Sequence, residues 1–332
     1  MSQSSVSQTN LVQQYAPWLY SFWKFSRPHT IIGTSLSVFG LYAIAIALSE
    51  TAVTFVDSLP VLGTWIACLC GNVYIVGLNQ LEDIEIDRIN KPHLPVAAGE
   101  YSLRQGQVIV AIAGILAVVL ALVQGPWLLA TVGISLTLGT AYSLPPIRLK
   151  RFPFWASFCI FTVRGVVVNL GLFLHGIWVL SQDKTGELWF THLAQMPPIR
   201  LSIPPSVWAL TLFVLGFTFA IAIFKDIPDI EGDKQYNIST FTIRLGTRSV
   251  FELARWTITV CYLAIALFGL LRSPGVNPIF LGISHIIALA LLWWRTQQVD
   301  LSNKLQIASC YQFIWKLFFV EYIIFPLACL LA

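Results

Sequence analysis

Long apolar stretches separated by short polar segments run along almost the whole chain. Nine of them approach or exceed the ~20 residues that one membrane crossing needs. They lie at about 30–48, 60–79, 108–123, 127–143, 155–180, 206–224, 256–271, 279–294 and 307–331. Open strand edges are not stable in lipid, and these runs are too continuous for barrel strands. The pattern therefore predicts an all-α integral membrane protein with nine transmembrane helices.

The composition agrees with this prediction and excludes other classes. The chain has 332 residues, of which 56% are hydrophobic and only 11% are charged, against about 25% charged residues in soluble proteins. A soluble domain, a disulfide scaffold and a disordered chain are excluded. The six cysteines lie in or beside apolar stretches without zinc-ligand spacing, so we interpret them as small buried residues. The basic residues lie between apolar runs, so no nucleic-acid partner is expected, and no obligate protein partner is evident.

Basic residues alternate between the two sides of the predicted membrane. Fifteen of the 20 lie in the N-terminal segment and in the loops after the second, fourth, sixth and eighth spans. The positive-inside rule therefore predicts a cytoplasmic N-terminus. The first 16 residues carry no basic residue and hence no recognisable targeting signal, which favours a cyanobacterial protein of the inner membrane or thylakoid. We expect a polar tail over 1–22 and a single domain over 23–332.

Half of the 16 acidic residues are concentrated in two short windows, after the second and sixth spans. Two triplets within them recur at helical spacing, each expected on one helix face: Asn79, Asp83 and Asp87, and Asp226, Asp229 and Asp233. Both windows fall on the basic side of the membrane. The chain therefore resembles two related halves, about 23–150 and 151–332.

Crowded carboxylates repel one another unless cations neutralise them. Two acidic faces opposed across a cavity would form a hard-oxygen site for Mg²⁺, which takes phosphate oxygens of a substrate as its remaining ligands. We expect all six side chains of the two triplets to be metal ligands, and four of them to be catalytic: Asp83, Asp87, Asp226 and Asp229. Four nearby basic residues are candidates for binding a diphosphate: Lys91, Arg148, Lys150 and Lys225.

The acidic windows admit two other interpretations. They could be ordinary solvated loops, which two matched windows at one membrane face disfavour. They could also belong to a divalent-cation carrier, but transporter sites lie near the midplane of the bilayer, and the neighbouring basic residues would repel a cation.

The two windows resemble the motifs of a known family. Asn-Gln-x-x-Asp-x-x-x-Asp from Asn79 and Lys-Asp-x-x-Asp-x-Glu-Gly-Asp from Lys225, on nine apolar spans, are similar to the UbiA superfamily of intramembrane prenyltransferases. Within it the chain is most similar to the homogentisate phytyltransferases, which share Gln80 where most members carry Asp. That residue argues against chlorophyll synthases and 4-hydroxybenzoate polyprenyltransferases. His93 and Val96 depart from the pattern of the branch, which leaves the aromatic acceptor open.

The resemblance implies a ring of helices around a central cavity, capped at the cytoplasmic side by loops 2/3 and 6/7. It implies Mg²⁺-dependent transfer of a prenyl group, phytyl in this branch, from its diphosphate to homogentisate with loss of CO₂ in tocopherol biosynthesis. A solanesyl or shorter tail, or another acceptor, remains an alternative. Besides these substrates, the lipid bilayer is the expected partner.

Homogentisate is an anion, so its carboxylate needs a cationic or hydrogen-bonding partner. Arg164 is the strongest candidate because a charge in the middle of a span is costly and usually faces the bundle interior. The other candidates are Asn169 and His175 in the same span, and Arg27 and His29 before the first. His175 is more readily interpreted as a satisfied interior histidine. Lys316 and Glu321 interrupt the last span on different faces, and we assign them no role.

Overall fold

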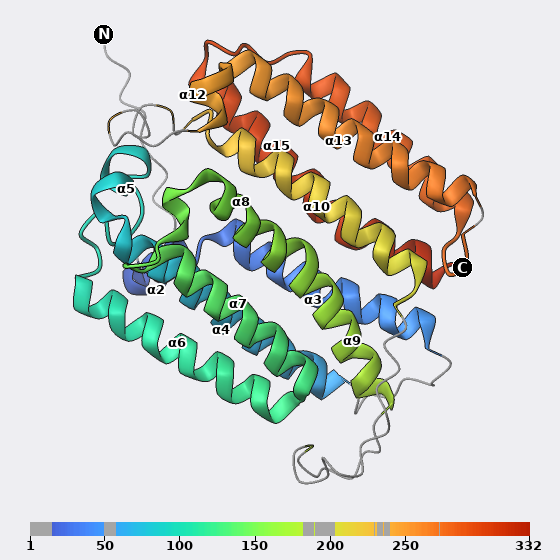
Figure 1. Ribbon diagram of the computed structural model, residues 1–332, viewed down its shortest axis with the longest axis horizontal. Helices are drawn as coiled ribbons and strands as arrows, with labels where there is room; N and C mark the ends of the chain where they lie inside the picture. Colours follow the sequence, from blue (N-terminus) through green and yellow to red (C-terminus); the bar gives the residue numbers. More distant parts are fainter. Residues whose placement is uncertain are drawn as a thin grey trace.

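The computed structural model describes residues 15–49, 58–181, 189, 203–228, 230, 235, 240–271 and 273–332. All regular elements in these ranges are helices, and the long ones run side by side in a bundle (Figure 1). The prediction of an all-α fold is confirmed.

The first part of the bundle comes from the N-terminal half of the chain. Its helices are α2 (Pro17–Phe25), α3 (Pro28–Leu48), α4 (Ser58–Glu82), α5 (Ile84–Asn90), α6 (Leu103–Gln124) and α7 (Pro126–Ser143). The short helix α2 begins inside the segment 1–22 that the sequence analysis assigned to a polar tail.

The second part begins after a short 3₁₀ turn, η2 (Leu149–Arg151). A bent helix follows, made of α8 (Pro153–Phe161), the π-helical turn η3 (Thr162–Val167) and α9 (Val168–Ser181). The remaining helices are α10 (Pro205–Lys225), α12 (Phe241–Leu245), α13 (Thr247–Leu270), α14 (Pro278–Thr296) and α15 (Lys304–Leu330).

Eight of the described helical segments are long and apolar enough to cross a membrane. The predicted count of nine is therefore not confirmed. The remaining predicted span, α7, is not among them: five of its 18 residues are Ser or Thr, namely Thr131, Ser135, Thr137, Thr140 and Ser143. It nevertheless lies where the fourth span was predicted, packed against α4, α6 and α9.

The helix boundaries follow local sequence signals. Proline occupies the first turn of α3, α7, α8, α10 and α14, where its missing N–H has no intrahelical partner to lose. Ser102 and Gln105 form a capping box at the start of α6. Between α6 and α7 the backbone of Gly125 has a φ of 141°, a value that residues other than glycine rarely adopt.

Helix α3 joins the two parts of the bundle, because it contacts α4 in the first part and α9 and α15 in the second. Helix α10 packs between α13 and α15 and is the most deeply buried of the spans. The six cysteines are free thiols, four of them buried.

Candidate active site at one end of the bundle

The first acidic window lies where α4 gives way to α5. Helix α4 ends at Glu82 and α5 begins at Ile84, with Asp83 at the N-cap position between them. The continuous helix face expected for Asn79, Asp83 and Asp87 is therefore interrupted at Asp83. Asn79 still reaches it, because Nδ2 of Asn79 donates to Oδ2 of Asp83 at 3.0 Å. Asp87, one turn further on in α5, is buried.

Basic side chains surround this window. A guanidinium nitrogen of Arg148 lies 3.1 Å from Oδ1 of Asp83, and Nζ of Lys150 lies 2.7 Å from its Oδ2. Arg27 donates to Oδ1 of Asn79 at 3.2 Å. Burial lowers the pKa of Lys150, although the adjacent Asp83 carboxylate acts in the opposite direction. Two of the four diphosphate candidates thus lie directly on Asp83.

Both of the arginines that contact Asn79 or Asp83 have unusual backbone conformations. Arg27 has a φ of 54° and Arg148 a φ of 38°, and they are the only residues other than glycine with positive φ in the described ranges. Left-handed conformations cost side-chain-bearing residues about 1–3 kcal/mol and cluster at functional sites. The fold accepts this cost at the two positions that aim guanidinium groups at Asn79 and Asp83.

The second acidic window follows α10. Asp226 is the C-cap residue of α10, and its Oδ1 lies 4.0 Å from Nζ of Lys225. Asp229 and Asp233 lie outside the described residues. Helix α5, which carries the end of the first window, and helix α12, which follows the second, lie at the same end of the bundle (Figure 1).

Tyr142, at the end of α7, connects the two windows electrostatically. It lies within reach of the charges of Asp83 and Arg27 and also of those of Lys225 and Asp226. No role is predicted for Tyr142 from the sequence, although it opens the Tyr-Ser-Leu-Pro-Pro segment before Arg148. The structure thus joins Asn79 and Asp83 to Arg148 and Lys150 by direct contacts, and places Asp226 and Lys225 within electrostatic range of the same tyrosine as Asp83.

Lys91, the fourth residue predicted to bind the diphosphate, is the C-cap residue of α5. It is an electrostatic neighbour of His29 and His93. Burial lowers the pKa of His93, with the positive charges of Lys24 and Lys91 adding to the effect. Lys91 therefore lies on the side of the site formed by the start of α3.

The five candidates for the aromatic acid separate into two groups. Arg164 and His29 both contact Trp315: the guanidinium carbon of Arg164 lies 4.9 Å from its ring centre, and the two ring centres of His29 and Trp315 are 5.0 Å apart. Arg27, two residues before His29, links this group to Asn79.

The other two candidates are bonded inside the bundle. Nδ2 of Asn169 donates to the backbone carbonyl oxygens of Arg164 and Gly165. Nε2 of His175 is 3.0 Å from the hydroxyl of Thr64, about 16 Å along the helix from Arg164. His175 therefore lies away from the other candidates, as an interior histidine with a partner.

The last span contains an arrangement that sequence reasoning missed. His285 of α14 and Glu321 of α15 form a fully buried pair, with Nε2 of His285 3.1 Å from a carboxylate oxygen of Glu321. The ring of His285 also packs edge-on against Phe213 and Tyr262. Glu321 thus has a structural partner in a neighbouring helix, which spacing within its own helix could not reveal.

Oxygen donors at the first window suit Mg²⁺, which is bound in proteins by few carboxylates together with substrate phosphates. Asn79, Asp83, Asp87 and Asp226 are all of this donor type and lie at the same end of the bundle. No group of three or more His, Cys, Asp or Glu side chains able to hold a metal occurs within the described ranges. Asp229 and Asp233, the remaining predicted ligands, fall outside those ranges.

The loop after α5 is fastened to α2. Glu100 accepts hydrogen bonds from Ser21, at 2.6 Å, and from Lys24, and the hydroxyl of Tyr101 donates to the carbonyl of Trp18 at 2.9 Å. The bonds from Lys24 and Ser21 keep the pKa of Glu100 below its usual range in spite of partial burial. Loop 2/3 is therefore held against a helix that precedes the first span.

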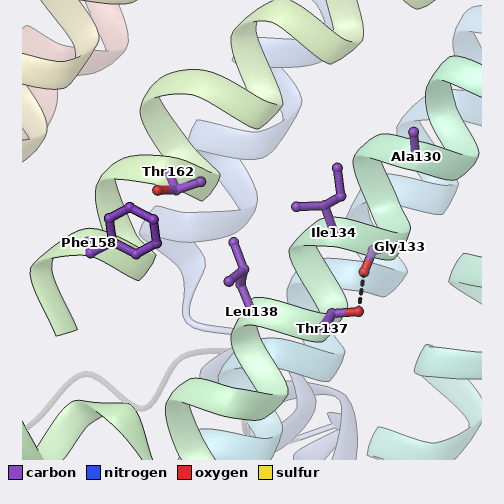
Figure 2. A pocket seen from close by; sticks show the side chains of 7 residues that line it. All are labelled: Ala130, Gly133, Ile134, Thr137, Leu138, Phe158 and Thr162. Carbon is purple, nitrogen blue, oxygen red and sulfur yellow. Dashed lines mark hydrogen bonds between the residues drawn. The ribbon is translucent and has the colours of Figure 1, made fainter. Parts of the chain in front are cut away.

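An apolar groove of about 510 Å³ lies elsewhere, between α7 and the bent helix α8–η3 (Figure 2). It is lined from α7 and from the bent helix by Ala130, Gly133, Ile134, Thr137, Leu138, Phe158 and Thr162. None of these side chains is charged, so the groove suits hydrocarbon rather than a phosphate and is separate from the acidic windows. The predicted central cavity stays a prediction.

These features define a helical membrane bundle with an acidic and basic site at one end. The UbiA prenyltransferase family model matches residues 36–317, and the chain belongs to this family. It is 52% identical over 311 residues to the homogentisate phytyltransferase of a Synechocystis species, covering 93% of this chain and 96% of that protein.

More distant relatives agree. The chain is 41% identical to the chloroplastic homogentisate phytyltransferase 1 of Arabidopsis thaliana, over 93% of this chain and 75% of that protein. Its fold is similar to that of a UbiA homologue from Archaeoglobus fulgidus bound to GPP and Mg²⁺, with a TM-score of 0.58, 15% identity, and coverage of 94% of this chain and all of that one.

Proposed function

We propose that the protein transfers a phytyl group from phytyl diphosphate to homogentisate with loss of CO₂, a step of tocopherol biosynthesis. The observation that carries this proposal is the cluster in which Asn79 and Asp83 contact Arg27, Arg148 and Lys150. Such a set of oxygen donors and cations suits a metal-bound diphosphate, and the 52% identity to a homogentisate phytyltransferase supports the choice of substrates.

In this proposal the two acidic windows hold Mg²⁺ through six side chains: Asn79, Asp83, Asp87, Asp226, Asp229 and Asp233. When bound, Mg²⁺ would supply positive charge that stabilises the departing diphosphate. Arg148, Lys150, Lys225 and Lys91 bind the remaining phosphate oxygens. Asp83 positions Arg148 and Lys150 through the ion pairs described above.

The reaction breaks the allylic C–O bond of the prenyl diphosphate, and the diphosphate leaves with the bonding electrons. The electron-rich ring of the acceptor then forms a C–C bond to the allylic carbon and gives up one ring proton. Loss of CO₂ from the side chain returns one proton to the methylene carbon. The two proton movements cancel, so the site needs to shuttle a proton but not to supply one.

The carboxylate of the acceptor is assigned to Arg164. The Arg164 side chain lies inside the bundle and contacts Trp315, as His29 does. His29 is two residues from Arg27, which contacts Asn79 of the first acidic window. An arginine can form two parallel hydrogen bonds to a carboxylate. A positive charge within a membrane span is costly without such a partner.

We place the site at the cytoplasmic face of a bacterial inner membrane or thylakoid, following the distribution of basic residues. Because both substrates are charged at one end, a site at the membrane boundary allows the acceptor to arrive from water while the isoprenoid tail stays in lipid.

The test uses the purified protein in liposomes with ¹⁴C-labelled homogentisate, Mg²⁺, and phytyl, geranylgeranyl or solanesyl diphosphate. We expect a prenylated quinol to form fastest from phytyl diphosphate, with release of labelled CO₂ from carboxyl-labelled homogentisate. A faster reaction with solanesyl diphosphate would replace the phytyl assignment. Absence of product from homogentisate with every donor would remove the acceptor assignment.

A further inference from the structure

Arg164 faces aromatic side chains from one helix. Its guanidinium carbon lies 4.9 Å from the ring centre of Trp315 and 5.9 Å from that of Phe318. Tyr311 and Tyr322 are its other electrostatic neighbours. These four residues are spaced at i, i+4, i+7 and i+11, so they form one face of α15. Within the described ranges no carboxylate lies at ion-pair distance from Arg164.

A second polar group in this cluster also has no partner among the described residues. Trp315 is 4% exposed, and its indole Nε1 makes no hydrogen bond there. Buried donors are normally paired, and an unpaired one needs an explanation. A cation and an orphan N–H donor on one aromatic wall are what a ring bearing a carboxylate and hydroxyl groups would satisfy.

The backbone that carries Arg164 is itself unusual. Arg164 lies in the π-helical turn η3, in the middle of an otherwise α-helical span. Such turns are rare in proteins, and those that do occur are often found at functional sites. Because a π turn adds a residue to the repeat, it rotates the side chains on either side of it relative to one another. The direction in which Arg164 points therefore depends on keeping this turn.

Two buried side chains from different helices hold the turn. Nδ2 of Asn169 donates to the carbonyl oxygens of Arg164, at 3.1 Å, and Gly165, at 2.7 Å. The hydroxyl of Tyr322 donates to Oδ1 of Asn169 at 2.8 Å. Asn169 is completely buried and Tyr322 is 2% exposed. A chain of hydrogen bonds thus runs from α15 through Asn169 to the backbone of Arg164.

We propose that Tyr322 and Asn169 are positioning residues, which fix the π turn and thereby aim Arg164 at the carboxylate of the aromatic acceptor. The inference rests on the proposed function for the identity of the acceptor. Neither residue touches the substrate in this account. Both act through Arg164, so their removal should weaken recognition of the carboxylate and leave the diphosphate site unchanged.

The test measures steady-state kinetics of Tyr322→Phe, which removes one hydroxyl and keeps the ring. We expect the KM for homogentisate to rise about five- to tenfold, the value of one lost hydrogen bond. The KM for the prenyl diphosphate should stay within about twofold of the wild-type value. Asn169→Asp, which keeps the acceptor for Tyr322 but loses the donor to the two carbonyls, should give the same selective change.

A double-mutant cycle separates positioning from packing. In an Arg164→Gln background, Tyr322→Phe should have no further effect on the KM for homogentisate, because the group that it positions is gone. Tyr42→Phe is the matched control: Tyr42 is equally buried and its hydroxyl lies 3.0 Å from that of Thr64, away from η3. It should leave both KM values unchanged.

Three results would overturn the inference. They are an equal rise of both KM values in Tyr322→Phe, an additive effect in the Arg164→Gln background, or the same acceptor defect in Tyr42→Phe. Each of these three results can be obtained as long as the wild-type enzyme prenylates an aromatic acid. Failure of the proposed function appears instead in the wild-type protein, as absence of product from homogentisate.

Discussion

At the scale of single residues, the site depends on Asp83. Its carboxylate is the point where Asn79 of α4, Arg148 from the segment after α7 and Lys150 of η2 meet. It also occupies the N-cap between α4 and α5. Because Asp83 lies at the helix break and contacts all three polar neighbours, an apolar residue in its place would remove these contacts from the candidate site.

We expect Asp83→Asn to lower kcat for prenyl transfer by at least about 100-fold, the usual effect of removing one group that stabilises transition-state charge. The variant keeps the size of the side chain, so the protein should still elute from a sizing column as the wild type does. Glu85→Gln is the control, since the Glu85 side chain is exposed and its ion pair is with Arg88, three residues further on. Equal activity of Asp83→Asn and Glu85→Gln would contradict the assignment.

The residues of this site could be named from the sequence because spacing within one helix is visible in it. Asn79 and Asp83 are four residues apart and are in contact. The break at Asp83 was not foreseen, since the window contains neither Gly nor Pro to signal the end of a helix. Glu321 illustrates the same limit: its partner His285 lies in another helix, 36 positions away.

At the scale of helices, close packing of α4 against α6 and α7 depends on small residues. An added Cβ at Gly114 of α6 would lie 2.7 Å from the ring of Tyr74 in α4. The hydroxyl of Tyr74 is 2.7 Å from that of Thr140 in α7, so this tyrosine joins three helices. Membrane helices approach closely where glycine removes the side chain between them.

We therefore expect Gly114→Val to destabilise the protein by about 1–3 kcal/mol, the usual cost of overpacking. A lower melting temperature in detergent, followed by the fluorescence of a thiol-reactive dye, measures the loss. Gly133→Ala in α7 is the control, because an added Cβ there meets no atom within 4 Å. Gly114→Val that melts with the wild type would show that Tyr74 yields without cost.

The sequence predicted the positions of the helices well because hydrophobic length alone marks a membrane span. It did not predict the π turn at Thr162–Val167, which no residue type there announces. It also did not predict the aromatic face of α15, since aromatic residues are common throughout this chain.

At the scale of the whole molecule, the number of crossings decides which way the ends face. Eight described segments satisfy length and apolarity, and α7 is the ninth candidate. If α7 also crosses, the two ends of the chain lie on opposite sides of the membrane. If it does not, they lie on the same side.

We expect nine crossings with a cytoplasmic N-terminus. In a bacterial host, green fluorescent protein should fluoresce when fused before residue 1 and stay dark when exported at the C-terminus. Alkaline phosphatase should be active when fused after residue 332. Fluorescence of both the N-terminal and the C-terminal fusions, together with an inactive phosphatase fusion, would rule out an odd number of crossings.

The bonds between loop 2/3 and α2 have a mechanical consequence. Tyr15, Trp18 and Trp23 in and before α2 are exposed, and aromatic side chains of this kind settle among lipid headgroups. An anchor at that depth, tied through Glu100 and Tyr101 to the loop after α5, sets the height of the first acidic window in the bilayer. In the proposed reaction, the isoprenoid tail of the donor would stay in the hydrocarbon region while its diphosphate reaches the proposed ligands at the membrane boundary.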